Sequence, residues 1–196
     1  MNALVYQPGL VIAALWVLFA LSWIAAMVWS DSASQRLGLG KEIAYRVVLV
    51  VGGVIFAIPA HGYTGPMRLW MVDLTEAWIC VGLMIVGFAF AWWARIYLGK
   101  LWSGNITTKA DHRVVDRGPY AIVRHPIYTG ILIAVLGTMI AKGTVAGIAG
   151  AVIITLGLWI KARLEEKFLR EQLGTAAYDD YRRRVPMLMP FGPKTS

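Results

Sequence analysis

Two groups of polar residues flank a short apolar hairpin in this 196-residue chain. The group before the hairpin contains His125, which is followed by Pro126 and Tyr128. Proline suits the first position of a helix, and a helix N-terminus is a ready site for anions. The group after the hairpin contains the adjacent carboxylates Glu165 and Glu166. Because the two ends of a helical hairpin meet at one surface, these groups predict a single site with a candidate acid–base histidine.

Each group indicates its own ligand chemistry. Paired carboxylates just beyond an apolar segment can hold a hydroxyl-rich or cationic ligand. Lys161 precedes Glu165 by four residues and therefore shares its helix face. This cation can receive an anionic group of a substrate. Arg124 flanks the start of the hairpin, and a Gly-Pro-Tyr turn at residues 118–120 comes shortly before it.

Composition identifies the elements that must position these residues. Hydrophobic residues make up 58% of the chain, and the mean hydropathy is +0.61. A soluble domain is usually about 45–50% apolar. The excess occurs in long runs, which predicts an all-α integral membrane protein. Five transmembrane helices are expected, at residues 10–29, 43–60, 74–93, 127–141 and 144–160.

The fourth and fifth segments are predicted to form a tight helical hairpin, because only Lys142 and Gly143 separate them. Several glycines in these two segments are expected to let the two helices approach closely. These glycines are Gly130, Gly137, Gly147, Gly150 and Gly157. The fifth helix is expected to continue past the membrane as a tail helix over residues 161–173, stopped by Gly174.

The distribution of positive charge predicts the orientation. Arg36, Lys41 and Arg46 surround the first connection, whereas the second carries only Arg68. The third connection and the C-terminal tail are again rich in Lys and Arg. The positive-inside rule then places the N-terminus outside, and the active site and the C-terminus in the cytoplasm. Both polar groups face the same compartment in this arrangement.

Several classes of site are not expected. A single cysteine, Cys80, leaves no disulfide framework and no CxxC metal motif, and the three histidines show no metal spacing. The net charge of +8 is attributed to the positive-inside rule rather than to nucleic-acid binding. Membrane lipids are therefore the expected surroundings, and neither nucleic acid nor an obligate protein partner is predicted.

The polar motifs together resemble one enzyme family. The resemblance covers about half of the chain, from residue 98 to residue 191, and its specific part is a histidine-proline-tyrosine run with a glutamate pair downstream. The chain is similar here to the isoprenylcysteine carboxyl methyltransferases and to their relatives, the phospholipid N-methyltransferases. The motifs are Leu98-Gly99, Trp102-Ser103, His112-Arg113-Val114-Val115, Gly118-Pro119-Tyr120, Arg124-His125-Pro126-Ile127-Tyr128-Thr129-Gly130 and Glu165-Glu166-Lys167-Phe168-Leu169.

The resemblance implies a membrane methyltransferase that uses S-adenosyl-L-methionine. It assigns cofactor binding to Asn105, His112, Arg113, Val114, Val115, Tyr120, His125, Pro126, Ile127, Tyr128, Glu165 and Glu166. Catalytic roles fall to Arg124, His125 and Glu165. Asn105 stands where the eukaryotic carboxyl methyltransferases have glutamine, and Lys161 stands where they have a substrate-side arginine, a role that Arg163 can also take. No metal is implied.

This reading predicts one membrane domain over residues 1–196. The first three spans lie within residues 1–97, a cytoplasmic cofactor loop covers 98–126, the hairpin covers 127–162 and the cytoplasmic tail covers 163–196.

The expected substrate is a lipophilic acceptor that enters from the bilayer. A carboxylate of the isoprenylcysteine type needs no base and is the first expectation. A phospholipid amine or another small amine is the alternative, and it would need His125 or a glutamate to remove a proton. A nicotinamide-dependent membrane reductase and a transporter are further alternatives. No dinucleotide fingerprint supports the reductase, and no charge at mid-span supports the transporter.

Overall fold

A computed structural model describes residues 7–29, 35–36, 39–58, 67–99, 102, 107–108 and 114–194. This part of the chain is almost entirely helical. Its α-helices are α1 (Gln7–Ala25), α2 (Leu39–Ala57), α3 (Leu74–Leu98), α4 (Pro119–Ile122), α5 (Pro126–Lys142), α6 (Val145–Leu173) and α7 (Thr175–Arg184). A 3-10 turn, η2 (Ala26–Trp29), follows α1, and the two-residue strands β1 (Gln35–Arg36) and β2 (Thr107–Thr108) pair antiparallel.

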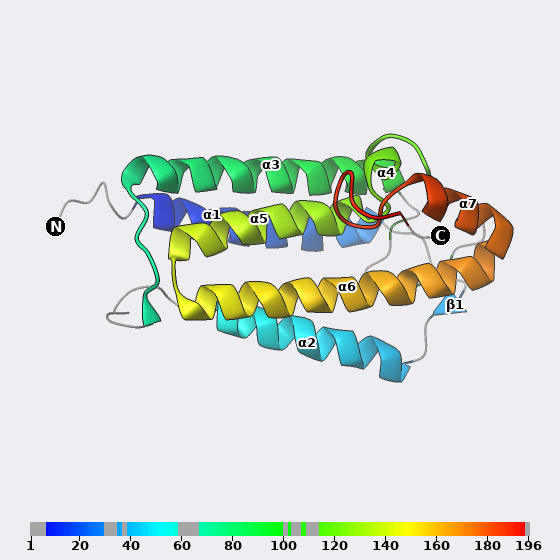
Figure 1. Ribbon diagram of the computed structural model, residues 1–196, viewed down its shortest axis with the longest axis horizontal. Helices are drawn as coiled ribbons and strands as arrows, with labels where there is room; N and C mark the ends of the chain where they lie inside the picture. Colours follow the sequence, from blue (N-terminus) through cyan, green and yellow to red (C-terminus); the bar gives the residue numbers. More distant parts are fainter. Residues whose placement is uncertain are drawn as a thin grey trace.

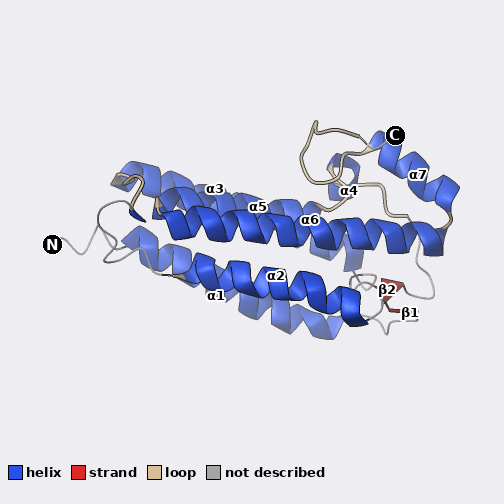
Figure 2. Cartoon of the chain, turned by 60° about the horizontal axis from the view of Figure 1, so that its bottom comes forward, coloured by secondary structure: helices blue, strands red, loops and turns tan. Residues whose placement is uncertain are grey.

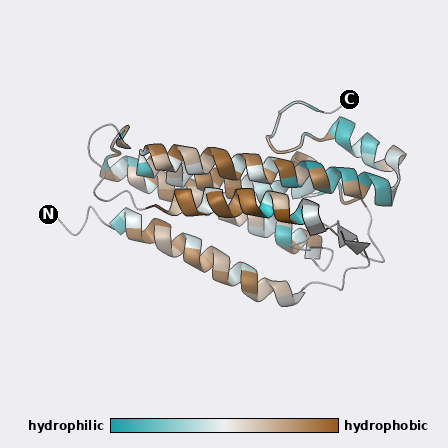
Figure 3. Ribbon diagram, turned by 90° about the horizontal axis from the view of Figure 1, so that it is seen from below, coloured by the Kyte–Doolittle hydropathy of each residue, from teal (hydrophilic) through white to brown (hydrophobic). Residues whose placement is uncertain are grey.

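The five longer helices run side by side along the long axis of the molecule, and the short helices α4 and α7 gather at one end of it (Figure 1). Within the described residues, α1, α3 and α6 are long and apolar enough to cross a membrane, and α5 is a shorter apolar helix. Figure 3 shows the same division, with hydrophobic colour along the bundle and hydrophilic colour on α7. Crossing by α2 and α5 as well, which five spans require, stays a prediction.

Local sequence signals set the helix ends. Asp73 caps α3, because its side chain accepts from the N–H of Glu76 at 2.8 Å while the Glu76 carboxylate accepts from the N–H of Asp73 at 2.9 Å. The Thr144 hydroxyl accepts from the N–H of Gly147 at 3.0 Å and starts α6. As predicted, α6 continues beyond the apolar segment to Leu173 and ends before Gly174. A single helix therefore carries both membrane wall and site residues.

The glycines of α5 and α6 do allow close packing, but only Gly147, which lies against Lys142, packs toward the other helix of the hairpin as predicted. For the other four, the expectation was wrong. Gly130 lies against Gly87 and Ala91 of α3, and Gly137 lies against Cys80 of the same helix. On α6, Gly150 lies against Phe56 of α2 and Gly157 against Leu49. The bundle is thus built from two tight pairs, α3 with α5 and α2 with α6, although α5 and α6 are consecutive.

At the end of the bundle remote from α7, a lysine side chain joins α5 to α2. The Lys142 ammonium, at the end of α5, donates to the carbonyl oxygens of Phe56 and Ile58 at the end of α2. Carbonyls at a helix C-terminus lack intrahelical partners, and a cation there is favourable. This contact joins α5 to α2 and so links the pairs α3–α5 and α2–α6 at this end of the bundle.

Candidate functional site

The predicted polar groups meet at the end of the bundle where α4, the start of α5, the second half of α6 and α7 come together (Figures 1 and 2). Pro126 occupies the first position of α5, as its fixed backbone angle suits, and His125 is the preceding residue. Glu165 and Glu166 lie on α6, about two turns before its end at Leu173. The α5 start and the acidic pair of α6 are in direct contact.

A buried ion pair forms the centre of the site. The Arg124 guanidinium Nε donates to Glu166 Oε1 at 2.6 Å, and both side chains are almost completely buried. The same guanidinium donates through its Nη1 to the carbonyl oxygens of Arg182, at 3.0 Å, and Val185. Charged groups are stable away from water only when they are paired and hydrogen-bonded. Arg124 thus ties α6 to the end of α7.

The segment after α7 completes this arrangement through its backbone. The N–H of Arg124 donates to the carbonyl of Pro186 at 2.9 Å, and the N–H of His125 donates to that of Met187 at 3.1 Å. The Tyr181 hydroxyl donates to the carbonyl of Tyr120 at 2.7 Å. These bonds satisfy polar groups of the turn before α5, so the C-terminal segment fixes the direction in which His125 enters the site.

The second glutamate of the acidic pair is held differently. The Tyr128 hydroxyl donates to Glu165 Oε1 at 2.6 Å, and His125 Nδ1 lies 3.4 Å from Glu165 Oε2. The rings of His125 and Tyr128 are stacked, with an interplanar angle of 4°. The Glu165 side chain keeps more exposure than that of Glu166, 17% against 5%. Glu166 is therefore enclosed by protein groups, whereas Glu165 remains open on one side.

His125 bridges the two carboxylates. Its Nε2 lies 3.3 Å from Glu166 Oε1, while its Nδ1 faces Glu165. Burial by itself lowers the pKa of His125, but the hydrogen bonds and charges of Glu165 and Glu166 outweigh it and hold the pKa above its ordinary value. The imidazolium form is favoured, so His125 is suited to holding the carboxylates in place and poorly suited to accepting a further proton.

The raised pKa of His125 predicts a pH dependence of stability. A histidine with a raised folded-state pKa contributes stability that is complete below the unfolded pKa, about 6.5, and is lost as the pH rises through the folded pKa. We therefore expect the free energy of unfolding of the wild type to exceed that of a His125→Gln variant. The difference should be largest at about pH 6 and should shrink toward about pH 9. Unfolding in detergent, followed by tryptophan fluorescence, measures it. A difference that grows with pH would contradict the assignment.

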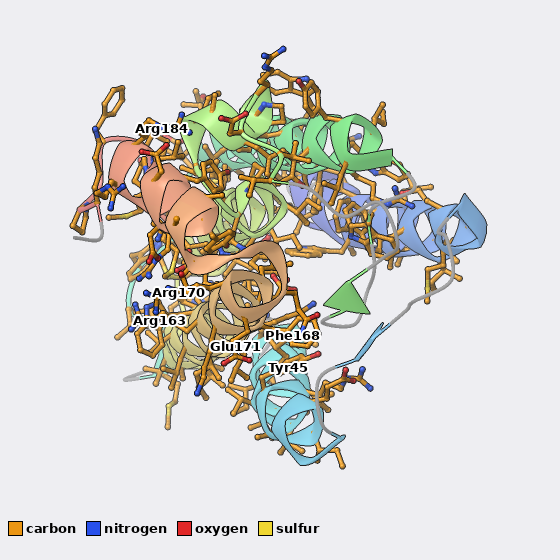
Figure 4. The ribbon with its side chains drawn as sticks, turned by 90° about the vertical axis from the view of Figure 1, so that its right-hand side faces the viewer. Tyr45, Arg163, Phe168, Arg170, Glu171 and Arg184 are labelled. Atoms are coloured by element: carbon orange, nitrogen blue, oxygen red, sulfur yellow. The ribbon has the colours of Figure 1, made fainter. Side chains whose placement is uncertain are left out.

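The two candidate substrate cations point in different directions. Lys161 Nζ lies over the ring of Tyr128, 5.2 Å from its centroid, and 5.6 Å from the centroid of Tyr45. The Arg163 guanidinium instead lies over Trp159, 5.8 Å from its centroid. Figure 4 shows Arg163 pointing outward, away from Tyr45. Lys161 is therefore the cation that the structure brings to the site.

The structure describes some of the remaining predicted cofactor residues and not others. Tyr120, Ile127 and Tyr128 belong to one buried apolar cluster, against which Val115 packs. Val114 packs nearby against Tyr178, Tyr181 and Val185. Asn105, His112 and Arg113 lie outside the described residues.

Sequence reasoning missed two residues of the site. Arg182 Nε lies 3.5 Å from Glu166 Oε2 and its Nη1 lies 3.2 Å from Asp179, so this arginine faces the acidic pair. The preceding Asp179, at i−3, was a signal of its internal pairing. Tyr45 on α2 is the other missed residue, since α2 was read only as an apolar span.

The fold and the site together define an integral membrane protein with a buried charged centre at one end of its helices. A family model described as phospholipid methyltransferase matches residues 75–176, slightly more than half of the chain. The chain therefore belongs to the phospholipid methyltransferase family. The match includes α3, α5 and α6 but not α2.

Curated relatives carry more specific names. The chain is 31% identical over 119 residues to a protein-S-isoprenylcysteine O-methyltransferase of Schizosaccharomyces pombe, a match that covers 58% of this chain and 49% of the relative. It is 34% identical over 88 residues to protein-S-isoprenylcysteine O-methyltransferase B of Arabidopsis thaliana, covering 44% of each. It is 30% identical over 139 residues to methanethiol S-methyltransferase 2 of Bradyrhizobium diazoefficiens, covering 64% and 51%. The chain spans about half the length of the curated relatives it matches.

Proposed function

We propose that this protein is a membrane methyltransferase that uses S-adenosylmethionine to methylate an anionic group of a lipophilic acceptor. A carboxylate is the first candidate for that group. The observation that carries the proposal is the pairing of an open carboxylate with a cation on one turn of α6. Glu165 is held by Tyr128 and His125, and Lys161 lies four residues earlier over the Tyr128 ring.

The donor set of the site fits the cofactor. S-adenosylmethionine, when bound, supplies an electrophilic methyl group on a sulfonium, which the acceptor oxygen takes as S-adenosylhomocysteine leaves. Glu165 can accept hydrogen bonds from hydroxyl or ammonium groups, and its open side leaves it available for them. Val115, Tyr120 and Ile127 supply an apolar lining around Tyr128, whose hydroxyl contacts Glu165.

The protein residues act by positioning and by excluding water. A carboxylate nucleophile needs no base, so the contribution required is orientation, which can be worth about 7–11 kcal/mol. The packed helices α5 and α6 provide a rigid apolar wall for it. Both ring nitrogens of His125 face carboxylates, and its pKa is raised by them despite burial. This engagement disfavours an ammonium acceptor, which would have to lose a proton to a base.

A small thiol is the second candidate acceptor. The observation that favours it is the set of relatives named methanethiol S-methyltransferase, among them one 42% identical over 77 residues. A thiol reacts as its thiolate, an anion that Lys161 can attract. Unlike a carboxylate, it must first give up a proton to solvent, and the two candidates also differ in the size and length of the acceptor.

The orientation of the site is part of the proposal. We place α2 and α5 in the membrane with α1, α3 and α6, and the charged end of the bundle in the cytoplasm. A cysteine introduced at the exposed Glu171 position should react with an impermeant thiol reagent from the cytoplasmic side alone. Labelling from the outside would reverse the orientation.

Cofactor binding tests the proposal directly. Titration of the purified protein in nanodiscs with S-adenosylhomocysteine should show binding, and Glu165→Ala should weaken it at least about tenfold, a loss of about 1.4 kcal/mol. Glu171→Ala is the matched control, because Glu171 is an exposed glutamate on the same helix (Figure 4). Absence of binding by the wild type, or equal binding by Glu165→Ala, would remove the basis of the proposal.

A further inference from the structure

One buried polar group near the site has no partner. The Tyr45 side chain on α2 is 2% exposed, yet its hydroxyl has no hydrogen-bond partner among the described residues. Buried hydroxyls in native proteins are almost always hydrogen-bonded, and an exception requires an explanation. One such explanation is that the hydroxyl pairs with a ligand, because ligand binding then removes the cost of burying an unpaired hydroxyl.

The position of Tyr45 connects it to the acidic pair of α6. Its ring packs against Phe168 and Leu164 of α6 (Figure 4). Lys161 Nζ lies between the ring of Tyr45, at 5.6 Å, and the ring of Tyr128, at 5.2 Å. Tyr128 in turn donates to Glu165. Tyr45 therefore faces the same ammonium group as the candidate cofactor residues, but from a different helix.

Two residues of opposite charge flank Tyr45 on α2. Glu42, one turn before Tyr45, pairs with Arg46 at 2.6 Å. Its second oxygen, Oε1, is buried and also has no hydrogen-bond partner among the described residues. Lys161 brings an ammonium group to Tyr45 from α6, with its Nζ 5.6 Å from the centroid of the Tyr45 ring.

We propose that Tyr45 and Lys161 form the subsite that holds the anionic head of the acceptor. The Tyr45 hydroxyl donates a hydrogen bond to the anion, and Lys161 provides the opposite charge; hydrogen bonds to ionised acceptors are roughly twice as strong as neutral ones. Tyr45 lies outside the residues that the family model matches. Recognition of the acceptor thus draws on both α2 and α6, whereas binding of the methyl donor falls to α5 and α6. This inference rests on the proposed function for the anionic acceptor and for the identity of the donor.

A matched pair of probes tests the subsite. N-acetyl-S-dodecylcysteine carries a carboxylate, and N-acetyl-S-dodecylcysteamine is the same molecule without it. In nanodiscs, the wild type should bind the acid at least about tenfold more tightly, about 1.4 kcal/mol, and Tyr45→Phe should weaken binding of the acid about fivefold while leaving that of the cysteamine probe unchanged. Tyr97→Phe, which removes a hydroxyl from an exposed position on α3, should change neither.

Stability and cofactor binding separate a recognition role from a structural one. Tyr45→Phe removes a hydroxyl that has no partner, so the unfolding midpoint should stay the same or rise, and affinity for S-adenosylhomocysteine should not change. Dodecanethiol serves as a third probe for a thiolate acceptor. If neither the acid nor the thiol depends on Tyr45, the subsite is wrong. Failure of the wild type to bind S-adenosylhomocysteine would instead contradict the proposed function and leave the probe comparison readable.

Discussion

Replacing Arg124 with methionine is expected to lower the free energy of unfolding by about 3–5 kcal/mol. Arg124 is 4% exposed, and its guanidinium pairs with Glu166 at 2.6 Å. Its loss leaves a carboxylate buried without its main partner and removes the donor to the carbonyls of Arg182 and Val185. Breaking one side of a buried pair costs more than the pair itself contributes, because the remaining charge stays desolvated.

Unfolding in detergent, followed by tryptophan fluorescence, measures this loss. Arg163→Met is the control, since Arg163 is an exposed arginine whose removal should change the free energy by no more than about 0.5 kcal/mol. The double variant Arg124→Met/Glu166→Leu should recover part of the loss, because both charges are then absent. A single Arg124→Met variant as stable as the control would show that the pair does not hold the site together.

Replacing Gly130 with alanine is expected to separate α3 from α5. A Cβ at this position would collide with the carbonyl oxygen of Gly87 and would lie 2.7 Å from the backbone nitrogen of Ala91. Backbone atoms cannot turn aside as a flexible side chain can, so the helices must move apart. Overpacking usually costs about 1–3 kcal/mol, and a collision with backbone belongs at the upper end of that range or above it.

Gly82→Ala is the matched control on α3. A Cβ at Gly82 meets nothing within 4 Å, and alanine has a higher helix propensity than glycine. The control should keep or raise the unfolding midpoint, while Gly130→Ala should lower it and reduce the yield of monodisperse protein. Because His125 directly precedes α5, a movement of this helix should also reduce S-adenosylhomocysteine binding. Equal midpoints for the two variants would contradict the close α3–α5 approach.

The sequence was sufficient for the ends of the helices nearest the site. Pro126 marks the start of α5, and Gly174 marks the end of α6. These signals are local, because a missing N–H or a tolerated backbone angle acts on the residue that carries it. The choice of neighbouring helix is not local. A glycine such as Gly130 indicates that another helix packs closely against it but does not identify that helix. Here the neighbouring helix is α3 rather than α6.

The candidate site was predictable to the extent that side chains carry their own chemistry. The spacing of Lys161 and Glu165 placed them on one helix face, and the structure brings both to Tyr128. Lys161 and Arg163 differ by about 200° around a helix, so only one can face the site, but sequence does not say which. The backbone acceptors of Arg124 could not be predicted, because every residue carries the same carbonyl group and nothing in the sequence distinguishes that of Val185.

The positions of the partners of Arg124 in the sequence determine when the site can assemble during synthesis. Its carbonyl acceptors belong to residues 182 and 185, and its own N–H pairs with residue 186. A chain leaving the ribosome exposes its N-terminal part first. The ion pair with Glu166 is therefore completed by a segment that leaves the ribosome after helices α1 to α6. Until residues 182–186 have been translated, the nascent protein holds these apolar helices without the centre that they are built to carry.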